Sequence, residues 1–128
     1  MKLDPIEVLT DYLNSHSAIP RGTVLGDLTN HVTGSTHVYL EHMGGFRVVR
    51  ERMDRFDIEY AAYSRDRKQA IDLALLVREA LLDDLPNRKV SDALVLDVEE
   101  ISSPRYDPDD STREHVYCGQ VAAFLIEA

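Results

Sequence analysis

Apolar and polar residues alternate along residues 56–63, and this alternation predicts a half-buried β-strand. Phe56, Ile58 and Tyr60 fall on one face, with Asp57 and Glu59 between them, as the two-residue period of a strand requires. The preceding residues, 46–53, mix apolar side chains with arginines. That stretch is expected to form either a strand or an extended arm that leads into the strand.

After residue 64 the apolar period changes from two to about 3.6, which predicts a long helix over residues 66–84. Ser64 or Asp66 is expected to cap this helix, and Gln69 stands three residues after Asp66, as in a capping box. The Leu85-Pro86-Asn87 sequence is expected to end the helix. The residues that form its apolar face are Ala70, Leu73, Ala74, Val77 and Leu81.

Shorter patterns predict the remaining elements. Asp4-Pro5 is expected to open a first helix, with Asp4 as the cap and Pro5 at the first helical position. Strands are expected at 23–25, 37–43, 94–101 and 115–126, with a polar loop over 29–36, a turn at Gly44-Gly45 and a bulge at Gly119. The predicted fold class is α+β, with a mostly antiparallel sheet packed by two helices on one face, in a single domain over residues 1–128.

Composition limits the classes of function. The 128 residues suffice for one hydrophobic core, and 23 acidic against 14 basic residues give a formal net charge of −9. Such a charge argues against sequence-independent electrostatic binding of nucleic acid, because the phosphates would be repelled. The single cysteine, Cys118, excludes an internal disulfide. Since neither a signal peptide nor a membrane span of roughly 20 apolar residues is recognisable, synthesis in the cytoplasm is expected.

The residues that could support catalysis or bind a metal are not spaced for either task. Five histidines are present: His16, His31, His37, His42 and His115. They match no metal-ligand motif. On regular strands His37 and His42 would face opposite sides, and so would His115 and Cys118. The sequence therefore predicts no enzymatic activity, no metal and no cofactor.

The one basic cluster consists of Arg47, Arg50, Arg52 and Arg55, interspersed with acidic Glu51 and Asp54. A nucleic-acid patch is one interpretation. Alternating charge along an extended arm more often indicates ion pairs within the fold or across a subunit boundary. We favour the subunit boundary and predict that Arg47, Arg50 and Arg52 lie at a subunit interface.

A second candidate contact region is the segment Ser102–Thr112, which is rich in proline and acidic residues and is expected to form an exposed loop. Its charged residues are Arg105, Asp107, Asp109 and Asp110. The aspartates lack the spacing of a calcium-binding EF-hand loop. We expect this loop to contact a partner protein.

The order of these segments resembles the tail terminator (tail completion) proteins of long-tailed, siphovirus-type bacteriophages, and most closely those of phages that infect actinobacteria. The likeness covers nearly the whole chain and is carried by residues 55–63, the helix at 70–81, the acidic loop at 103–110 and the last strand at 115–125. One departure is Arg113, which is not adjacent to Tyr117 as the family pattern would have it.

The resemblance implies a structural virion protein that forms a hexameric ring on the last ring of the tail tube. Such a ring ends polymerisation of the tail tube protein and presents a surface to the head-completion (stopper) protein. In the family the sheet lines the lumen, through which DNA passes without specific binding, and the helices face outward. The implied location is the head-proximal end of the tail, after assembly in the host cytoplasm.

Three other interpretations remain open. A head-closure or stopper protein of the neck would share the acidity and the lack of catalytic residues. A small hydrolase or ligand-binding domain would use His37, Glu41 or Cys118, although no nucleophile and base stand at credible spacing. A nucleic-acid-binding regulator would use the arginine cluster, against the net acidity.

Overall fold

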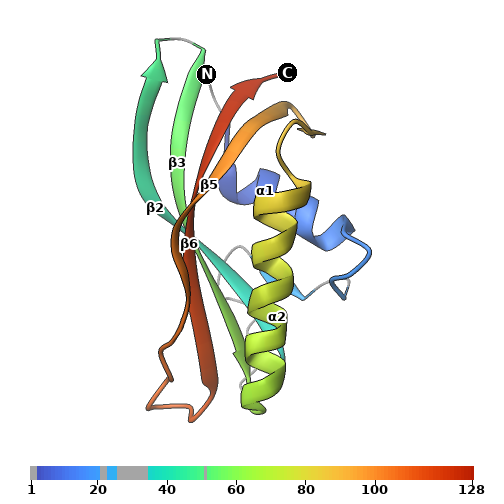
Figure 1. The fold of residues 1–128 in the computed structure, drawn as a ribbon, viewed down its shortest axis with the longest axis vertical. Coiled ribbons are helices and arrows are strands. Elements are labelled where there is room, and N and C mark those ends of the chain that lie inside the picture. The colour runs from blue at the N-terminus through green and yellow to red at the C-terminus, as the bar shows by residue number, and fades with distance from the viewer. Residues whose placement is uncertain (1–2, 21–22, 26–34, 51) are drawn as a thin grey trace.

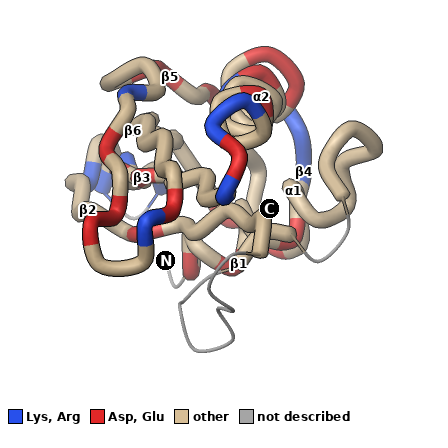
Figure 2. The backbone as a smooth tube through the Cα atoms, turned by 90° about the horizontal axis from the view of Figure 1, so that it is seen from below, with Lys and Arg blue, Asp and Glu red and all other residues tan. Residues whose placement is uncertain are grey.

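The computed structural model describes residues 3–20, 23–25, 35–50 and 52–128. Their elements form two layers, with both helices on the same side of a curled sheet (Figure 1). Figure 2, seen along the strands, shows the same arrangement. In chain order the elements are α1 (Pro5–Ser15), β1 (Val24–Leu25), β2 (His37–Val49), β3 (Met53–Ser64), α2 (Arg67–Glu79), η1 (Ala80–Asp84), β4 (Lys89–Val90), β5 (Ala93–Tyr106) and β6 (His115–Glu127).

The six-stranded sheet has the order β1-β2-β3-β6-β5-β4, and only the short β1–β2 pair is parallel. The predicted α+β class, with a mostly antiparallel sheet and two helices on one face, is therefore confirmed. The predicted loop over residues 29–36 lies outside the described residues except for its last two. The two-residue β4 was not predicted, because so short a strand leaves no periodic pattern.

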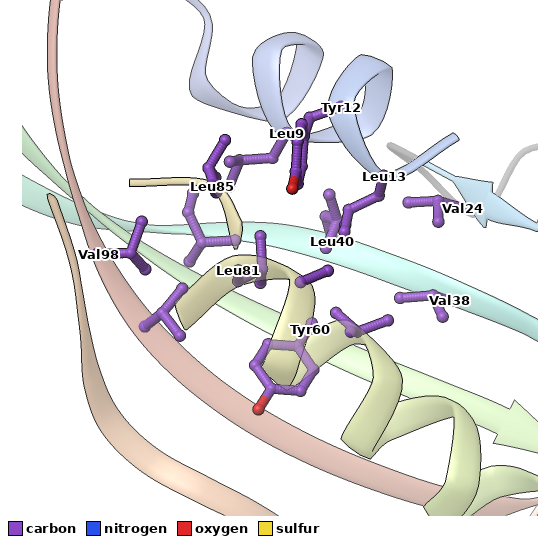
Figure 3. Packing of buried hydrophobic residues seen from close by; sticks show 14 of the residues in the cluster. Leu9, Tyr12, Leu13, Val24, Val38, Leu40, Tyr60, Leu81, Leu85 and Val98 are labelled. Atoms are coloured by element: carbon purple, nitrogen blue, oxygen red, sulfur yellow. The ribbon is translucent and has the colours of Figure 1, made fainter. Parts of the chain in front are cut away.

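The hydrophobic core fills the space between the sheet and the helices (Figure 3). Alternate residues of the strands meet the apolar faces of α1, α2 and η1 there, as the predicted periods require. The largest fully buried side chains of this core are Tyr60, Leu9, Leu13, Leu40, Ile58, Leu81, Leu85, Leu125, Val38, Val77 and Val95.

Both predicted helix starts are confirmed, but the capping box at α2 is not. The Asp4 carboxylate accepts hydrogen bonds from the backbone N–H groups of Ile6 and Glu7, and Asp66 accepts from that of Lys68. The Asp66 N–H donates to the Ser64 hydroxyl rather than to Gln69. Beyond Glu79 the helix continues as one turn of wider π-helix, η1, which ends before Leu85.

The prediction that Gly44-Gly45 turns the chain is wrong. β2 runs through both glycines to Val49 and pairs with β3 from Met53 onward, so β2 and β3 form one long hairpin. Both glycines have positive φ, 111° and 134°, and the β2–β3 register shifts between His42 and Gly44. The pair therefore makes a bulge within the ladder, because glycine adopts these angles without steric cost. A Cβ on Gly45 would collide with the Arg55 carbonyl of the paired strand.

The loop predicted for Ser102–Thr112 begins later than expected. Residues 102–106, including Pro104 and Arg105, belong to β5, and only residues after Tyr106 leave the strand. Proline is tolerated there because the outer edge of β5 needs no N–H donor for a neighbouring strand. The β5–β6 register shifts between Glu100 and Ser102 and again between Ser102 and Arg105, so the two strands pair on both sides of Pro104.

Gly119, where a bulge is predicted, pairs in regular register with Tyr60 of β3, whereas the β5–β6 register shifts across it, between the Ser102–Gln120 and Arg105–Cys118 pairs. Its role is steric: an added Cβ would collide with the ring and hydroxyl of Tyr60. The Tyr60 side chain is fully buried, burial raises the pKa of its phenol, and no hydrogen-bond partner of the hydroxyl is found among the described residues. Gly119 thus makes room for the largest side chain of the core.

We expect Gly119→Ala to lower the free energy of unfolding by about 1–3 kcal/mol, because the methyl group overpacks the site of the Tyr60 ring. Urea denaturation followed by circular dichroism would measure the change. In a Tyr60→Leu background the added cost of Gly119→Ala should shrink, since the colliding ring is gone. An undiminished cost there would assign the effect to the backbone of β6 instead.

Candidate functional site

The most exposed part of the described structure is the far half of the β2–β3 hairpin, here called the arm and defined as residues 41–50 and 52–57. Every residue from Glu41 to Arg50 is exposed, on both faces of β2. Large apolar side chains are among them, with exposed fractions of 58% for Phe46 and 50% for Met43. The arm and the C-terminus lie at one end of the molecule, and the β5–β6 connection lies at the other (Figure 1).

Part of the charge on the arm is already paired within the hairpin. Arg55 contacts Asp57 at 2.8 Å, and its guanidinium lies 5.1 Å from the ring centre of Phe46. Arg47 lies across from Asp54, with 3.7 Å between Nε and Oδ1. Alternating charge thus reflects local ion pairs at these positions, as one of the two interpretations of the sequence anticipated.

Arg50 and Arg52 differ from Arg47 and Arg55 in their ion pairing. Both are exposed at the hairpin turn, and neither forms an ion pair with any residue that the structure describes. Of the three arginines predicted for a subunit interface, Arg47 shares its charge with Asp54, while Arg50 and Arg52 have no ion-pair partner among the described residues.

An open groove of about 550 Å³ runs along the arm. Its charged and aromatic lining residues are His42, Phe46, Arg47, Asp54, Arg55 and Phe56. His42 packs edge-on against Phe56, and its Nε2 lies 3.1 Å from the Gly44 carbonyl oxygen. The groove thus offers aromatic surface and paired charges, which suit contact with another protein more than bond-making chemistry.

At the opposite end of the molecule, the connection from β5 to β6 is held by Asp109. Its carboxylate accepts hydrogen bonds from the Ser111 hydroxyl, at 2.7 Å, and from the backbone N–H groups of Ser111 and Thr112. These bonds lower the pKa of Asp109. Asp109 therefore shapes the loop, whereas Asp107 and Asp110 are exposed.

An aromatic cluster at the base of this loop was not predicted. The Tyr106 hydroxyl lies 2.7 Å from Nδ1 of His115, the Tyr106 and Tyr117 rings are 5.2 Å apart, and Arg67 donates to the Tyr117 hydroxyl at 2.9 Å. Tyr106 was assigned to a loop, so its pairing with Tyr117 across β5 and β6 could not be inferred. Arg105, on the same strand, lies opposite Cys118.

As predicted, His115 and Cys118 lie on opposite faces of β6. His115 contacts Tyr106, while Cys118 packs with Ala61 and Val116 on the other face of the sheet. Burial, aided by the negative charge of Glu59, raises the pKa of the Cys118 thiol to about 11. The thiol is only 5% exposed. It is therefore a neutral buried group at neutral pH, unlike the thiolate that a nucleophile requires.

The raised thiol pKa predicts how stability changes with pH. Because the folded-state pKa lies above the ordinary value of 9.0, the neutral thiol stabilises the fold fully below about pH 9, and this contribution is lost as the pH rises through about 11. Denaturation at pH 8, 9, 10 and 11 should show Cys118→Ala losing less stability over this range than the wild type. Equal losses would attribute the alkaline decline to the buried tyrosines.

The described histidines make contacts other than metal ligation. His16 lies 2.9 Å from Asp84, and His37 stacks on Tyr63 with 4.7 Å between ring centres. As predicted, His37 and His42 lie on opposite faces of β2. His31 is outside the described residues. Over the part of the chain that the structure describes, no three histidine, cysteine, aspartate or glutamate residues are grouped to hold a metal ion.

None of the described helices is long and apolar enough to cross a membrane. No protein-family model matches the chain, and no curated protein matches it. Among solved structures, the chain is similar to one from the virion of a native gene transfer agent particle. The TM-score is 0.72 and the identity is 11%, and the match covers 97% of this chain and 95% of that one. At this identity the similarity establishes a shared fold over nearly the whole length.

Proposed function

We propose that this chain is a structural virion protein of a phage-like particle, and specifically a tail terminator. In this role it forms a hexameric ring on the last ring of the tail tube protein, ends tube growth and presents a surface to the head-completion protein. DNA passes through its lumen without specific binding. The observation that carries the proposal is the fold similarity, over nearly the full length of both chains, to a component of a gene transfer agent virion.

Two features of the described structure support this assignment. The exposed arm and the Asp109-centred loop lie at opposite ends of the molecule (Figure 1), so a ring of such subunits would present different groups on its two rims. The net charge of −9 is repeated in every subunit, and an acidic ring repels phosphates and lets DNA slide. A structural role without enzymatic activity accords with the neutral, buried Cys118.

Electron microscopy of particles that carry a tagged copy of the chain would test the function. We expect one ring of density for the tag at the head-proximal end of each tail. In particles made without the chain, tails should be irregular in length and not joined to heads. Label distributed along the tube or confined to the distal tip would rule out a terminator, whereas label on the head vertex of tailless heads would favour the stopper.

A further inference from the structure

The outer part of β5, defined here as residues 101–106, is described in full by the structure and contains no buried side chain. Its outer edge has no strand neighbour among the described residues, because β4 pairs with β5 only at Ala93 and Leu94. The register of a strand is specified strongly where one of its faces is buried, and weakly where neither is. Burial therefore does not fix the register of this part of β5 against β6.

β5 holds two more residues than β6 over this stretch. Glu100 pairs with Val121 and Arg105 pairs with Cys118, so five residue steps along β5 correspond to three along β6. The two register shifts, one on each side of Ser102, take up the surplus. The outer part of β5 is thus shorter than a regular strand of the same number of residues.

A hydrogen bond holds β5 in this shortened form. The Ser103 hydroxyl donates to the Glu100 carboxylate at 2.7 Å. Arg78 of α2 fixes that carboxylate with two further hydrogen bonds, of 3.0 and 2.8 Å. In a regular strand, residues three apart point to opposite faces. The bond between Ser103 and Glu100 therefore exists only while the strand is irregular.

A regular ladder without the surplus has one definite register, called here the continued register. Between Asp97 and Glu100 the two strands pair without a shift. If that pairing continued, Ser103 rather than Arg105 would stand opposite Cys118. The end of β5 would then lie two residues farther along β6. Because side chains alternate between the two faces of a strand, a slip of two residues leaves Arg105 on its present face.

The contact at the end of β5 suits both registers. Tyr106 pairs with Tyr117 in the structure, and its hydroxyl lies 2.7 Å from Nδ1 of His115. In the continued register Tyr106 stands directly opposite His115. The hydrogen bond between these two side chains can therefore persist during the slip.

The buried hydroxyl of Tyr60 favours the continued register. Tyr60 is fully buried, and its hydroxyl has no hydrogen-bond partner among the described residues. The hydroxyl lies against Gly119, where an added Cβ would collide with it. In the continued register Ser102 stands opposite Gly119, on the face that bears Tyr60. Because an unpaired buried hydroxyl is unfavourable, pairing it with Ser102 would offset the loss of the bond between Ser103 and Glu100.

We propose that the outer part of β5 slips by two residues along β6, between the irregular register of the structure and the continued register. At about 3.4 Å per residue, the slip moves the end of β5 by roughly 7 Å toward the β5–β6 connection. This connection lies at the end of the molecule opposite the arm (Figure 1), so the slip extends its reach there. The switch is a property of the single chain and does not depend on the proposed function.

Disulfide formation with Cys118 distinguishes the two registers. Residues directly opposite on antiparallel strands have Cα atoms about 4.5–5.5 Å apart, which a disulfide can span. Oxidation of dilute protein by copper–phenanthroline, followed by mass spectrometry of peptides, would measure the rates. Arg105→Cys should form the disulfide rapidly. Ser103→Cys should form it more slowly, through the slipped register, which loss of the bond to Glu100 also favours.

Ile101→Cys is the matched control. Ile101 is exposed on the same strand, but it stands at least two residues from the level of Cys118 in both registers, which is too far for a disulfide. It should give no disulfide unless the protein unfolds.

A further substitution tests the role of the buried phenol. Tyr60→Phe removes the hydroxyl that the slip would pair. In the Ser103→Cys variant it should slow formation of the disulfide by about 3- to 10-fold, the value of one hydrogen bond. In the Arg105→Cys variant the rate should not fall, because that disulfide forms in the register of the structure.

Several outcomes would overturn the slip. One is a disulfide from Arg105→Cys with none from Ser103→Cys. Another is equal rates for Ser103→Cys and Ile101→Cys, which would show that cross-linking follows unfolding. No disulfide from either Arg105→Cys or Ser103→Cys would contradict the register from which the slip starts. A rate in Ser103→Cys that Tyr60→Phe leaves unchanged would contradict the pairing of the buried hydroxyl.

Discussion

Leu81→Ala is expected to lower the free energy of unfolding by about 2–5 kcal/mol, the range for a leucine truncated in a packed core. Leu81 is fully buried in η1 and lies between the helices and the sheet (Figure 3). Few neighbours can move to fill the space, because strands on one side and α1 on the other hold it. Since small domains are stable by about 5–15 kcal/mol, this one change would remove a large share of the total.

Urea denaturation at a concentration where the protein is monomeric would measure the loss. Leu75→Ala is the matched control, because Leu75 lies on α2 with 39% of its surface exposed and should change stability by less than about 0.5 kcal/mol. Equal effects of the two substitutions would mean that the buried face of the continuous helix formed by α2 and η1 has been assigned wrongly.

Asp107→Asn/Asp110→Asn is expected to leave a folded protein that fails to join its partner ring. The two aspartates are exposed at the end of the molecule opposite the arm, and Asp109, which shapes the loop, is retained. Loss of charged groups that pair across an interface costs about 2–5 kcal/mol, so on the proposed function the yield of joined particles should fall about 30-fold or more.

Infectious titre and counts of free heads and tails would measure this effect. Asp72→Asn/Asp83→Asn changes the charge equally on exposed helical positions and should leave the titre unchanged. A normal titre from the loop variant would remove the loop from the partner surface. A titre reduced equally by both variants would point to total charge rather than to a specific contact.

The periodic patterns of apolar residues were sufficient to predict much of the fold. Alternation around Ile58 predicted the central strand, and the helical spacing of Leu73 and Leu81 predicted which face of the long helix is buried. Both are local consequences of backbone geometry, which fixes where side chains point before any tertiary contact exists. The same geometry predicted that His115 and Cys118 lie on opposite faces of their strand, which the structure confirms.

The sequence reveals the arginine cluster but not which of its members form ion pairs within the hairpin. Composition placed Arg47, Arg50, Arg52 and Arg55 in one group. Only the hairpin register showed that Asp54 lies opposite Arg47 and that Arg55 reaches Asp57, which leaves Arg50 and Arg52 free of ion pairs among the described residues. Their interface role remains a prediction.

By itself, the sequence determined the class of fold, the helix caps and the buried faces, because these depend on residues within a few positions of one another. The tertiary structure decided what Gly44, Gly45 and Gly119 do. A glycine permits a turn, a bulge or a close approach equally well, and the choice depends on which chain segment lies beside it. The Arg55 carbonyl beside Gly45 and the Tyr60 ring beside Gly119 are supplied by β3, whose position is set by pairing across the whole sheet.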